Sequence, residues 1–134
     1  MAATVMLMTA NLDPVKVFLA DDSAMIRERV AALLAARDMA VVGEAETPEG
    51  CIDGILDARP DVVVLDVQLE GGTGLQVLRA VRAVDPAIAF IVFSNNAADC
   101  YRKRYLHEGA QRFLDKTSEF DQLATVVERA VRVH

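Results

Sequence analysis

The chain has 134 residues, of which 53% are hydrophobic, so it is long enough for one well-filled domain and too short for a second. Its formal net charge of -6 argues against nucleic-acid binding through phosphate neutralisation, because that mode needs clustered Lys and Arg. Residues 1–14 hold only a short apolar run without a basic start, far below the roughly 18 residues of a membrane span. We therefore expect a flexible leader over 1–14 and a cytoplasmic domain over 15–134.

The first predicted unit is a strand, an acidic turn and a helix. Residues 15–20 form a nearly continuous apolar run, which is typical of a strand buried on both faces. The polar residues Asp21, Asp22 and Ser23 follow this strand. Apolar residues then recur at helical spacing up to about Arg37, and Ser23 is the expected N-cap of this helix.

Four further units repeat this alternation. Strands are predicted over four apolar runs that end at polar or turn residues: 39–45, 61–66, 88–93 and 111–115. Helices follow each of them, and Gly109 is the expected C-terminal cap of the helix that starts near Ala97. The segment 70–74 is glycine-rich and predicts a turn. Five strands alternating with five helices predict an α/β fold, a parallel sheet doubly wound with helices on both faces.

Polar side chains follow four of the predicted strands: Asp21 and Asp22, Asp66, Ser94, and Lys116. Because ligands of such sheets bind outside the carboxyl ends of the strands, we expect these side chains to meet in one pocket. Three converging carboxylates repel each other by roughly a few kcal/mol, so the pocket needs a counter-charge. Mg²⁺ suits it, because the ion prefers oxygen ligands, and the backbone carbonyl of Gln68 could complete the set.

Phosphoryl transfer is the chemistry that this pocket favours. With a metal bound, one carboxylate can attack phosphorus, while the ammonium of Lys116 and the hydroxyl of Ser94 bind the transferred oxygens. Each residue also has a simpler interpretation as a helix cap, a turn residue or a solvated charge. Those interpretations require five coincidences at four strand ends, so we favour the functional one.

The order and spacing of these segments resemble the receiver domain of two-component response regulators over about residues 15–133. The resemblance is carried by LADDSAMIRERV, VVVLDVQLEGGTGLQVL, IVFSNNA and GAQRFLDK. It implies a flavodoxin-like sheet with strand order 2-1-3-4-5. It also implies a phosphoacceptor switch with self-catalysed phosphorylation and dephosphorylation, and not an enzyme in the usual sense.

The resemblance assigns the central roles residue by residue. Asp66 is the expected phosphoacceptor, and Asp21 and Asp22 would hold Mg²⁺ directly or through water. Ser94 and Lys116 would contact the phosphoryl group.

The remaining assignments concern the response to phosphorylation. Ser94 and Phe113 would form the switch that remodels the face made by the fourth helix, fifth strand and fifth helix. Gln68 and Asn96 match positions that tune phosphoryl lifetime in the family. We expect the amides of these two side chains to orient water and so to set the rate of hydrolysis.

The partners follow from the same resemblance. The expected phosphodonor is a histidine kinase or a histidine phosphotransfer protein. The switched face would dock a downstream protein, form a phosphorylation-dependent dimer or serve a relay. Because the sequence ends directly after the last helix, we expect a stand-alone domain; a fragment of a longer regulator with a DNA-binding module is the alternative. We expect neither nucleic-acid binding by this chain nor membrane insertion.

Three residues depart from the family pattern. Thr117 and Glu70 stand where proline is common, and Asn95 stands where a small residue is usual. A cis peptide after Lys116 costs roughly 2.5 to 4 kcal/mol without proline, which affects that loop. We expect altered kinetics and retained function. Two other functions are conceivable. One is a haloacid-dehalogenase-like phosphatase, but this sequence lacks the D-x-D-x-[TV] motif and the cap insertion of those enzymes. The other is an interaction module that never takes phosphate.

Overall fold

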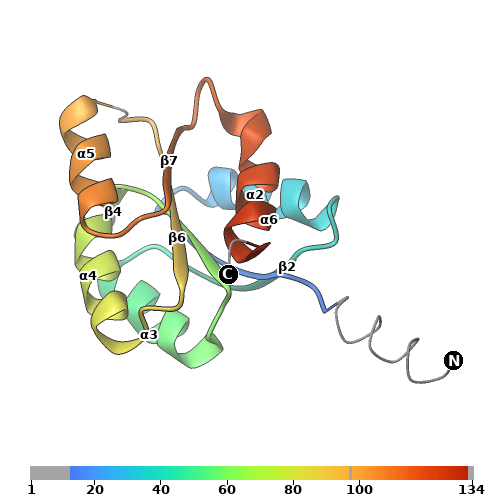
Figure 1. Cartoon of the computed structure of the whole chain (residues 1–134), viewed down its shortest axis with the longest axis horizontal. Coiled ribbons are helices and arrows are strands. Elements are labelled where there is room, and N and C mark those ends of the chain that lie inside the picture. The colour runs from blue at the N-terminus through green and yellow to red at the C-terminus, as the bar shows by residue number, and fades with distance from the viewer. Residues whose placement is uncertain (1–12, 97, 133–134) are drawn as a thin grey trace, which may run out of the picture.

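A five-stranded parallel sheet forms the centre of the protein (Figure 1). The computed structural model describes residues 13–96 and 98–132, so most of the expected leader lies outside the described residues. The strands lie in the spatial order β2 (Ala40–Ala45), β1 (Lys16–Ala20), β3 (Val62–Leu65), β6 (Ala89–Ser94) and β7 (Arg112–Asp115). In chain order this is 2-1-3-4-5, so the predicted fold and strand order are confirmed.

Burial explains the apolar character of the inner strands. Every residue of β3 and β6 is buried, and in β1 only Lys16 is exposed. A strand with helices on both faces has no side that meets water, so its sequence does not alternate between apolar and polar residues. The edge strand β2 is only partly buried, which agrees with its weaker pattern.

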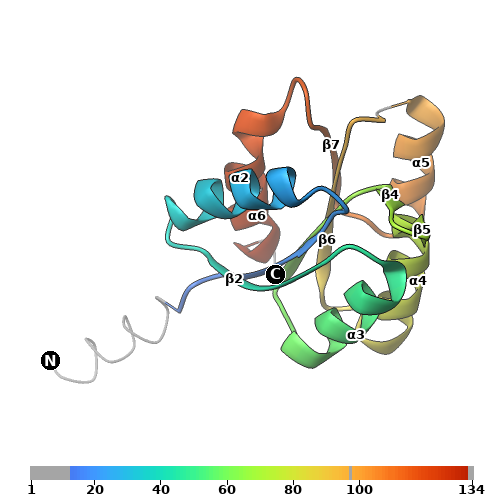
Figure 2. The same ribbon diagram turned by 180° about the vertical axis from the view of Figure 1, so that it is seen from behind.

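Five α-helices in the described part of the chain cover the two faces of the sheet. They are α2 (Ala24–Ala35), α3 (Pro48–Ala58), α4 (Gly74–Val84), α5 (Asp99–His107) and α6 (Leu123–Arg132), the last preceded by the short helix η1 (Phe120–Gln122). Helices α2 and α6 lie on one face, and α3, α4 and α5 lie on the other (Figure 2). Two apolar clusters, one on each face, therefore make up the core.

Local signals in the sequence set the ends of these helices. The backbone N–H of Ile26 donates to the hydroxyl of Ser23 at 3.2 Å, so the predicted N-cap is confirmed. Thr47 caps α3 in the same way, directly before Pro48. Gly109 adopts a positive φ of 112° just past α5, a conformation that favours glycine.

Two local features differ from expectation. Helix α5 spans Asp99–His107, so it begins two residues after the expected start near Ala97, a residue that lies outside the described part. The glycine-rich turn is a small antiparallel hairpin of β4 (Gln68–Leu69) and β5 (Gly72–Thr73). Strands of two residues are too short to show a period, so the sequence could indicate only the turn.

The described residues contain no helix that is long and apolar enough to cross a membrane. Both cysteines are free: Cys51 lies in the core, and Cys100 is exposed on α5.

Candidate functional site

The polar residues predicted to form the site meet at the carboxyl edge of the sheet. Asp21 follows β1, Asp66 follows β3, Ser94 ends β6 and Lys116 follows β7. These four are the only polar or charged side chains found buried among the described residues. A hollow of about 370 Å³ opens beside them. Burying polar and charged groups is unfavourable unless they form hydrogen bonds or ion pairs with one another. The contacts among these four side chains therefore decide which chemistry the hollow can support.

Three carboxylates cluster at this end of the sheet, and two of them, Asp22 and Asp66, line the hollow. Asp21, Asp22 and Asp66 each offer an oxygen, and these oxygens lie within 4.8 Å of one another. Asp21 and Asp66 are 6% and 8% exposed, whereas Asp22 is open to solvent. Carboxylate oxygens are the donors that Mg²⁺ prefers, and an open side leaves room for its waters. The residues present therefore fit a hard divalent cation.

Lys116 supplies the counter-charge. Its ammonium nitrogen lies 2.6 Å from a carboxylate oxygen of Asp21 and 3.0 Å from one of Asp66. Burial alone would lower the pKa of Lys116, but the hydrogen bond to Asp21 and the charges of both carboxylates raise it. Lys116 is therefore fully protonated at neutral pH and is held at Asp66 by Asp21.

Asp66 is the less well satisfied of the two buried carboxylates. Burial raises its pKa, and the opposing charge of Lys116 does not cancel that effect. One oxygen receives only a long contact of 3.5 Å from the backbone N–H of Gln68. Asp21, by comparison, accepts a 2.9 Å hydrogen bond from the backbone N–H of Ser23. A buried carboxylate with spare acceptor capacity is suited to act as a nucleophile or a metal ligand.

The backbone around Asp66 is fixed by close packing against the start of α4. The N–H of Gly74 donates to the carbonyl of Val67 at 2.8 Å. A Cβ atom on Gly74 would lie 2.2 Å from the carbonyl oxygen of Asp66. Only glycine allows this approach, which explains the position of Gly74 eight residues after Asp66.

Ser94 faces the same hollow from the other side. It is 3% exposed, and its hydroxyl accepts a 3.1 Å hydrogen bond from the backbone N–H of Asn96. Gln68, Asn95 and Asn96 are exposed, and all three line the hollow. The structure thus brings Gln68 and Asn96 to the rim of the site and places Asn95 there too.

The loop after Lys116 closes without a cis peptide, since none occurs in the described residues. The N–H of Thr117 instead donates to the carboxylate of Asp115 at 2.8 Å. The backbone N–H of Lys116 also donates to the carbonyl of Ser94 at 3.0 Å. Lys116 therefore reaches the hollow although Thr117 replaces the proline common in the family.

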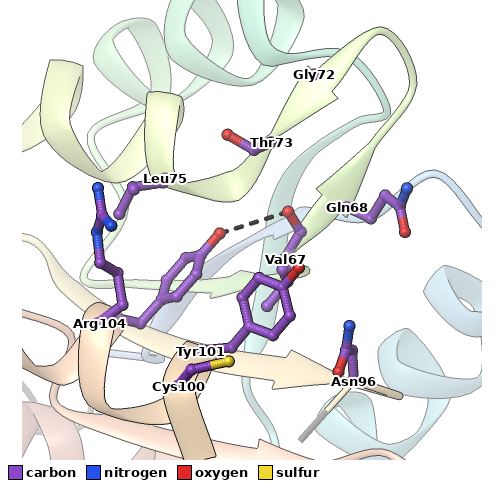
Figure 3. A pocket seen from close by; sticks show the side chains of 10 residues that line it. Val67, Gln68, Gly72, Thr73, Leu75, Asn96, Cys100, Tyr101 and Arg104 are labelled. Carbon is purple, nitrogen blue, oxygen red and sulfur yellow. Dashed lines mark hydrogen bonds between the residues drawn. The ribbon is translucent and has the colours of Figure 1, made fainter. Parts of the chain in front are cut away.

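Phe113 lies behind the site, in the core. It is 2% exposed, and Arg102 donates a 2.8 Å hydrogen bond to its carbonyl oxygen. Its ring packs edge to face with that of Tyr105, a buried residue of α5. The hydroxyl of Tyr105 donates to the carbonyl of Val67, the bond dashed in Figure 3. Sequence reasoning gave Tyr105 no role, because an aromatic residue within a run of basic residues carries no signal of burial.

Comparisons with known proteins agree with this geometry. The family model "Response regulator receiver domain" matches residues 17–128. The chain is 32% identical over 114 residues to the DNA-binding transcriptional activator DevR/DosR of Mycobacterium tuberculosis, covering 84% of this chain and 52% of that protein. It is 28% identical over 114 residues to the transcriptional regulatory protein DesR of Bacillus subtilis, covering 84% and 56%. The chain thus spans about half the length of these curated relatives.

Solved structures give the same result. The signal receiver domain of the putative response regulator NarL from Mycobacterium tuberculosis superposes with a TM-score of 0.84 at 28% identity, covering 91% of this chain and 99% of that one. A LuxR-family two-component response regulator from Aurantimonas sp. gives 0.84 at 26% identity, covering 90% and 86%. By sequence and by fold, the chain belongs to the family of response regulator receiver domains.

Proposed function

We propose that the chain is a phosphoacceptor switch of a two-component system, in which Asp66 takes a phosphoryl group from a phosphohistidine. The donor would be a histidine kinase or a histidine phosphotransfer protein. One observation carries the proposal: buried Asp66 lies within 4.8 Å of the oxygens of Asp21 and Asp22 and 3.0 Å from the ammonium of Lys116. Positive and negative groups therefore lie close to Asp66, which is the buried carboxylate with the weaker hydrogen bonds.

The transfer is a simple displacement at phosphorus. A carboxylate oxygen of Asp66 forms a bond to phosphorus while the phosphorus–nitrogen bond of the donor breaks, and the leaving imidazole keeps the electron pair. The product is an acyl phosphate. Lys116 and the hydroxyl of Ser94 would bind the phosphoryl oxygens, because both groups border the same hollow as Asp66. Attack of water on phosphorus later returns the carboxylate and releases inorganic phosphate.

The charge of the site supports a bound divalent cation. When ionised, the three carboxylates and Lys116 carry a net charge of -2. We propose that Asp21, Asp22 and Asp66, with the backbone carbonyl of Gln68, hold Mg²⁺ directly or through water. The ion supplies electrostatic stabilisation of the phosphoryl oxygens during transfer. Lys116 acts beside it, as a fixed positive charge on the side of Asp21.

The surface that changes on phosphorylation would be the face made by α5, β7 and α6. Ser94 and Phe113 are the proposed switch, since one touches the hollow and the other lies in the core behind it. A downstream protein, a second copy or a relay partner would then bind the changed face. We propose protein docking in the cytoplasm and no direct DNA contact, because the chain is acidic.

The test is covalent labelling. The protein is incubated with Mg²⁺ and a small-molecule phosphodonor, and intact mass is measured over time. We expect one phosphoryl group per chain, lost on standing, and no label on Asp66→Asn. A wild-type protein that stays unlabelled overturns the proposal and leaves an inert interaction module. Sustained turnover of many phosphomonoesters would instead identify a phosphatase.

A further inference from the structure

Helix α5 is attached to the rest of the domain mainly through one side chain. Tyr105 is the only buried residue of this helix, at 2% exposure, whereas Tyr101 is 39% exposed. Arg102 also links this helix to Phe113: it donates a hydrogen bond to the carbonyl of Phe113, and its guanidinium carbon lies 5.0 Å from the centroid of the Phe113 ring. Because an aromatic ring buries a large apolar area, the position of α5 depends on the position of the Tyr105 ring.

The hydroxyl of Tyr105 reaches the segment that follows Asp66. It donates to the carbonyl oxygen of Val67 with an oxygen–oxygen distance of 3.4 Å (Figure 3). A contact of this length is weak, but it joins α5 to the residue next to the reactive carboxylate. Burial raises the pKa of Tyr105 to about 12; the Leu75 N–H opposes this, and the charge of Asp66 adds to it. The phenol therefore remains a donor at neutral pH.

The ring of Tyr105 also restricts Phe113. The two rings meet edge to face, with centroids 6.1 Å apart and planes at 70°. Both residues belong to the same buried cluster. In a closely packed interior one ring cannot take a new position unless its neighbour gives way, so movement of Phe113 requires movement of Tyr105.

Space for that movement lies beside the ring. A cleft of about 480 Å³ lies beside the ring (Figure 3). One side of the cleft is formed by the hairpin and the start of α4, which contribute Gln68 and Leu75. The other side is formed by α5 and the segment before it, which contribute Tyr101 and Asn96. The cleft borders Val67 and so begins one residue from Asp66. A shift of the Tyr105 ring into this cleft would move α5 without opening the core.

Resting on the proposed function, we propose that Tyr105 is a positioning residue that couples phosphorylation of Asp66 to Phe113 and to α5. A phosphoryl group on Asp66 adds charge and bulk next to Val67 and so changes the contact that holds the Tyr105 hydroxyl. The ring then moves, Phe113 is released, and α5 follows because Tyr105 is its anchor. This is a two-state element biased by one local event.

The composition of the chain allows a direct test. It contains two tyrosines and no tryptophan, so in Tyr101→Phe all tyrosine emission comes from Tyr105. With Mg²⁺ and a phosphodonor, the emission intensity of this variant should change in step with the label measured by intact mass. The double variant Tyr101→Phe, Asp66→Asn should show no change. Complete labelling with constant emission overturns the coupling but leaves the proposed function intact, whereas absence of labelling overturns both.

A second variant isolates the hydroxyl. Tyr105→Phe keeps the ring, so the fold and the unfolding midpoint should change little. The rate constant of labelling should fall about two- to fivefold, as expected for one weak hydrogen bond. With the phosphoryl analogue beryllium fluoride, the NMR signals of the Phe113 ring should shift less than in wild type, while Tyr101→Phe keeps the full shift. Wild-type rates together with wild-type Phe113 shifts in Tyr105→Phe would contradict the role of the hydroxyl.

Discussion

The ammonium of Lys116 lies closer to Asp21, at 2.6 Å, than to Asp66, at 3.0 Å. Besides its proposed role as a metal ligand, Asp21 therefore holds the cation of Lys116 against Asp66, the carboxylate that we propose to be phosphorylated. Because Asp21 and Asp66 share the ammonium of Lys116, the charge of Asp66 is only partly neutralised, which agrees with the raised pKa of Asp66. A cation bound at this acidic cluster would therefore change the stability of the domain.

Removing the cation of Lys116 should destabilise the metal-free protein. In Lys116→Met the two buried carboxylates, Asp21 and Asp66, lose the only cation that forms a salt bridge with them among the described side chains, a change of about 3 kcal/mol for a broken buried pair. Thermal melts in EDTA should show a clearly lower midpoint. Lys103→Met, at an exposed lysine of α5, is the matched control and should melt as wild type. Equal midpoints for all three proteins would show that Lys116 is not needed to balance the acidic cluster.

Mg²⁺ should stabilise the folded domain. An ion that binds only the folded state raises the free energy of unfolding by RT ln(1 + [Mg²⁺]/Kd). The midpoint should therefore rise with millimolar Mg²⁺ and return with EDTA, and the rise should be larger in Lys116→Met because its site is more negative. Coincident melts with Mg²⁺ and with EDTA in wild type would rule out the proposed metal site.

Asp66→Asn should raise stability at neutral pH in EDTA. The folded protein holds the Asp66 proton more tightly than the unfolded chain does, because burial raises the pKa of this carboxyl. Asp66 therefore contributes stability below the ordinary pKa of an aspartate, and that contribution is lost as pH rises through the raised pKa. At pH 7 the ionised group is unfavourable, whereas asparagine stays neutral and Lys116 keeps Asp21. We expect a gain of roughly 3 °C, corresponding to about 1 kcal/mol.

The pH dependence distinguishes this effect from a general benefit of removing charge. The gain of Asp66→Asn over wild type should shrink as the solution is acidified, because the wild-type carboxyl then becomes protonated. Asp57→Asn, at an exposed position of α3, should have no such gain. A gain for Asp66→Asn that is independent of pH would show that ionisation of Asp66 is not its cause.

The fold could be predicted from the sequence because its signals are local. Runs such as residues 61–66 and caps such as Ser23 and Gly109 each depend on a few neighbours in the chain. The β4–β5 hairpin could not be predicted, since it depends on pairing of residues in two very short strands.

The candidate site was predictable only in outline. Strand order brings Asp21, Asp66, Ser94 and Lys116 to one edge, and the structure places them there. Which carboxylate Lys116 contacts most closely is a matter of tertiary packing, and no pattern of residues encodes it. The burial of Tyr105 was equally hidden, because it depends on how α5 packs against β7 and the ring of Phe113.

Gly74→Ala should distort the site. Alanine favours helices, so this change at the first residue of α4 would stabilise the protein if space allowed. The new Cβ, however, would lie 2.2 Å from the carbonyl oxygen of Asp66, and overpacking against backbone costs about 2 to 3 kcal/mol. Denaturant unfolding should show this loss, and labelling of Asp66 should slow. Gly71→Ala, which meets no atom but has a φ of 81°, should lose only about 1 kcal/mol and label normally.

Gln68 and Asn96 should set the lifetime of the phosphoryl group. Both side chains are exposed at the rim of the hollow, one beyond Asp66 and the other beyond Ser94, where an amide can orient a water molecule for attack on phosphorus. Replacing either with alanine should change the half-life of the label, measured by intact mass after removal of the phosphodonor. A change of about two- to tenfold corresponds to one hydrogen bond to the attacking water.

The matched control for these lifetimes is Asn95→Ala, because Asn95 lies between Ser94 and Asn96 and is also exposed at the rim. If the bulk of side chains at the rim limits the approach of water, Asn95→Ala should shorten the half-life of the label, and so should Gln68→Ala and Asn96→Ala. If orientation of water matters, the amide variants should lengthen it while Asn95→Ala does not. Half-lives identical to wild type in Gln68→Ala and Asn96→Ala would remove both amides from the hydrolysis step, leaving Lys116 and Ser94 as the side chains that act on the phosphoryl group.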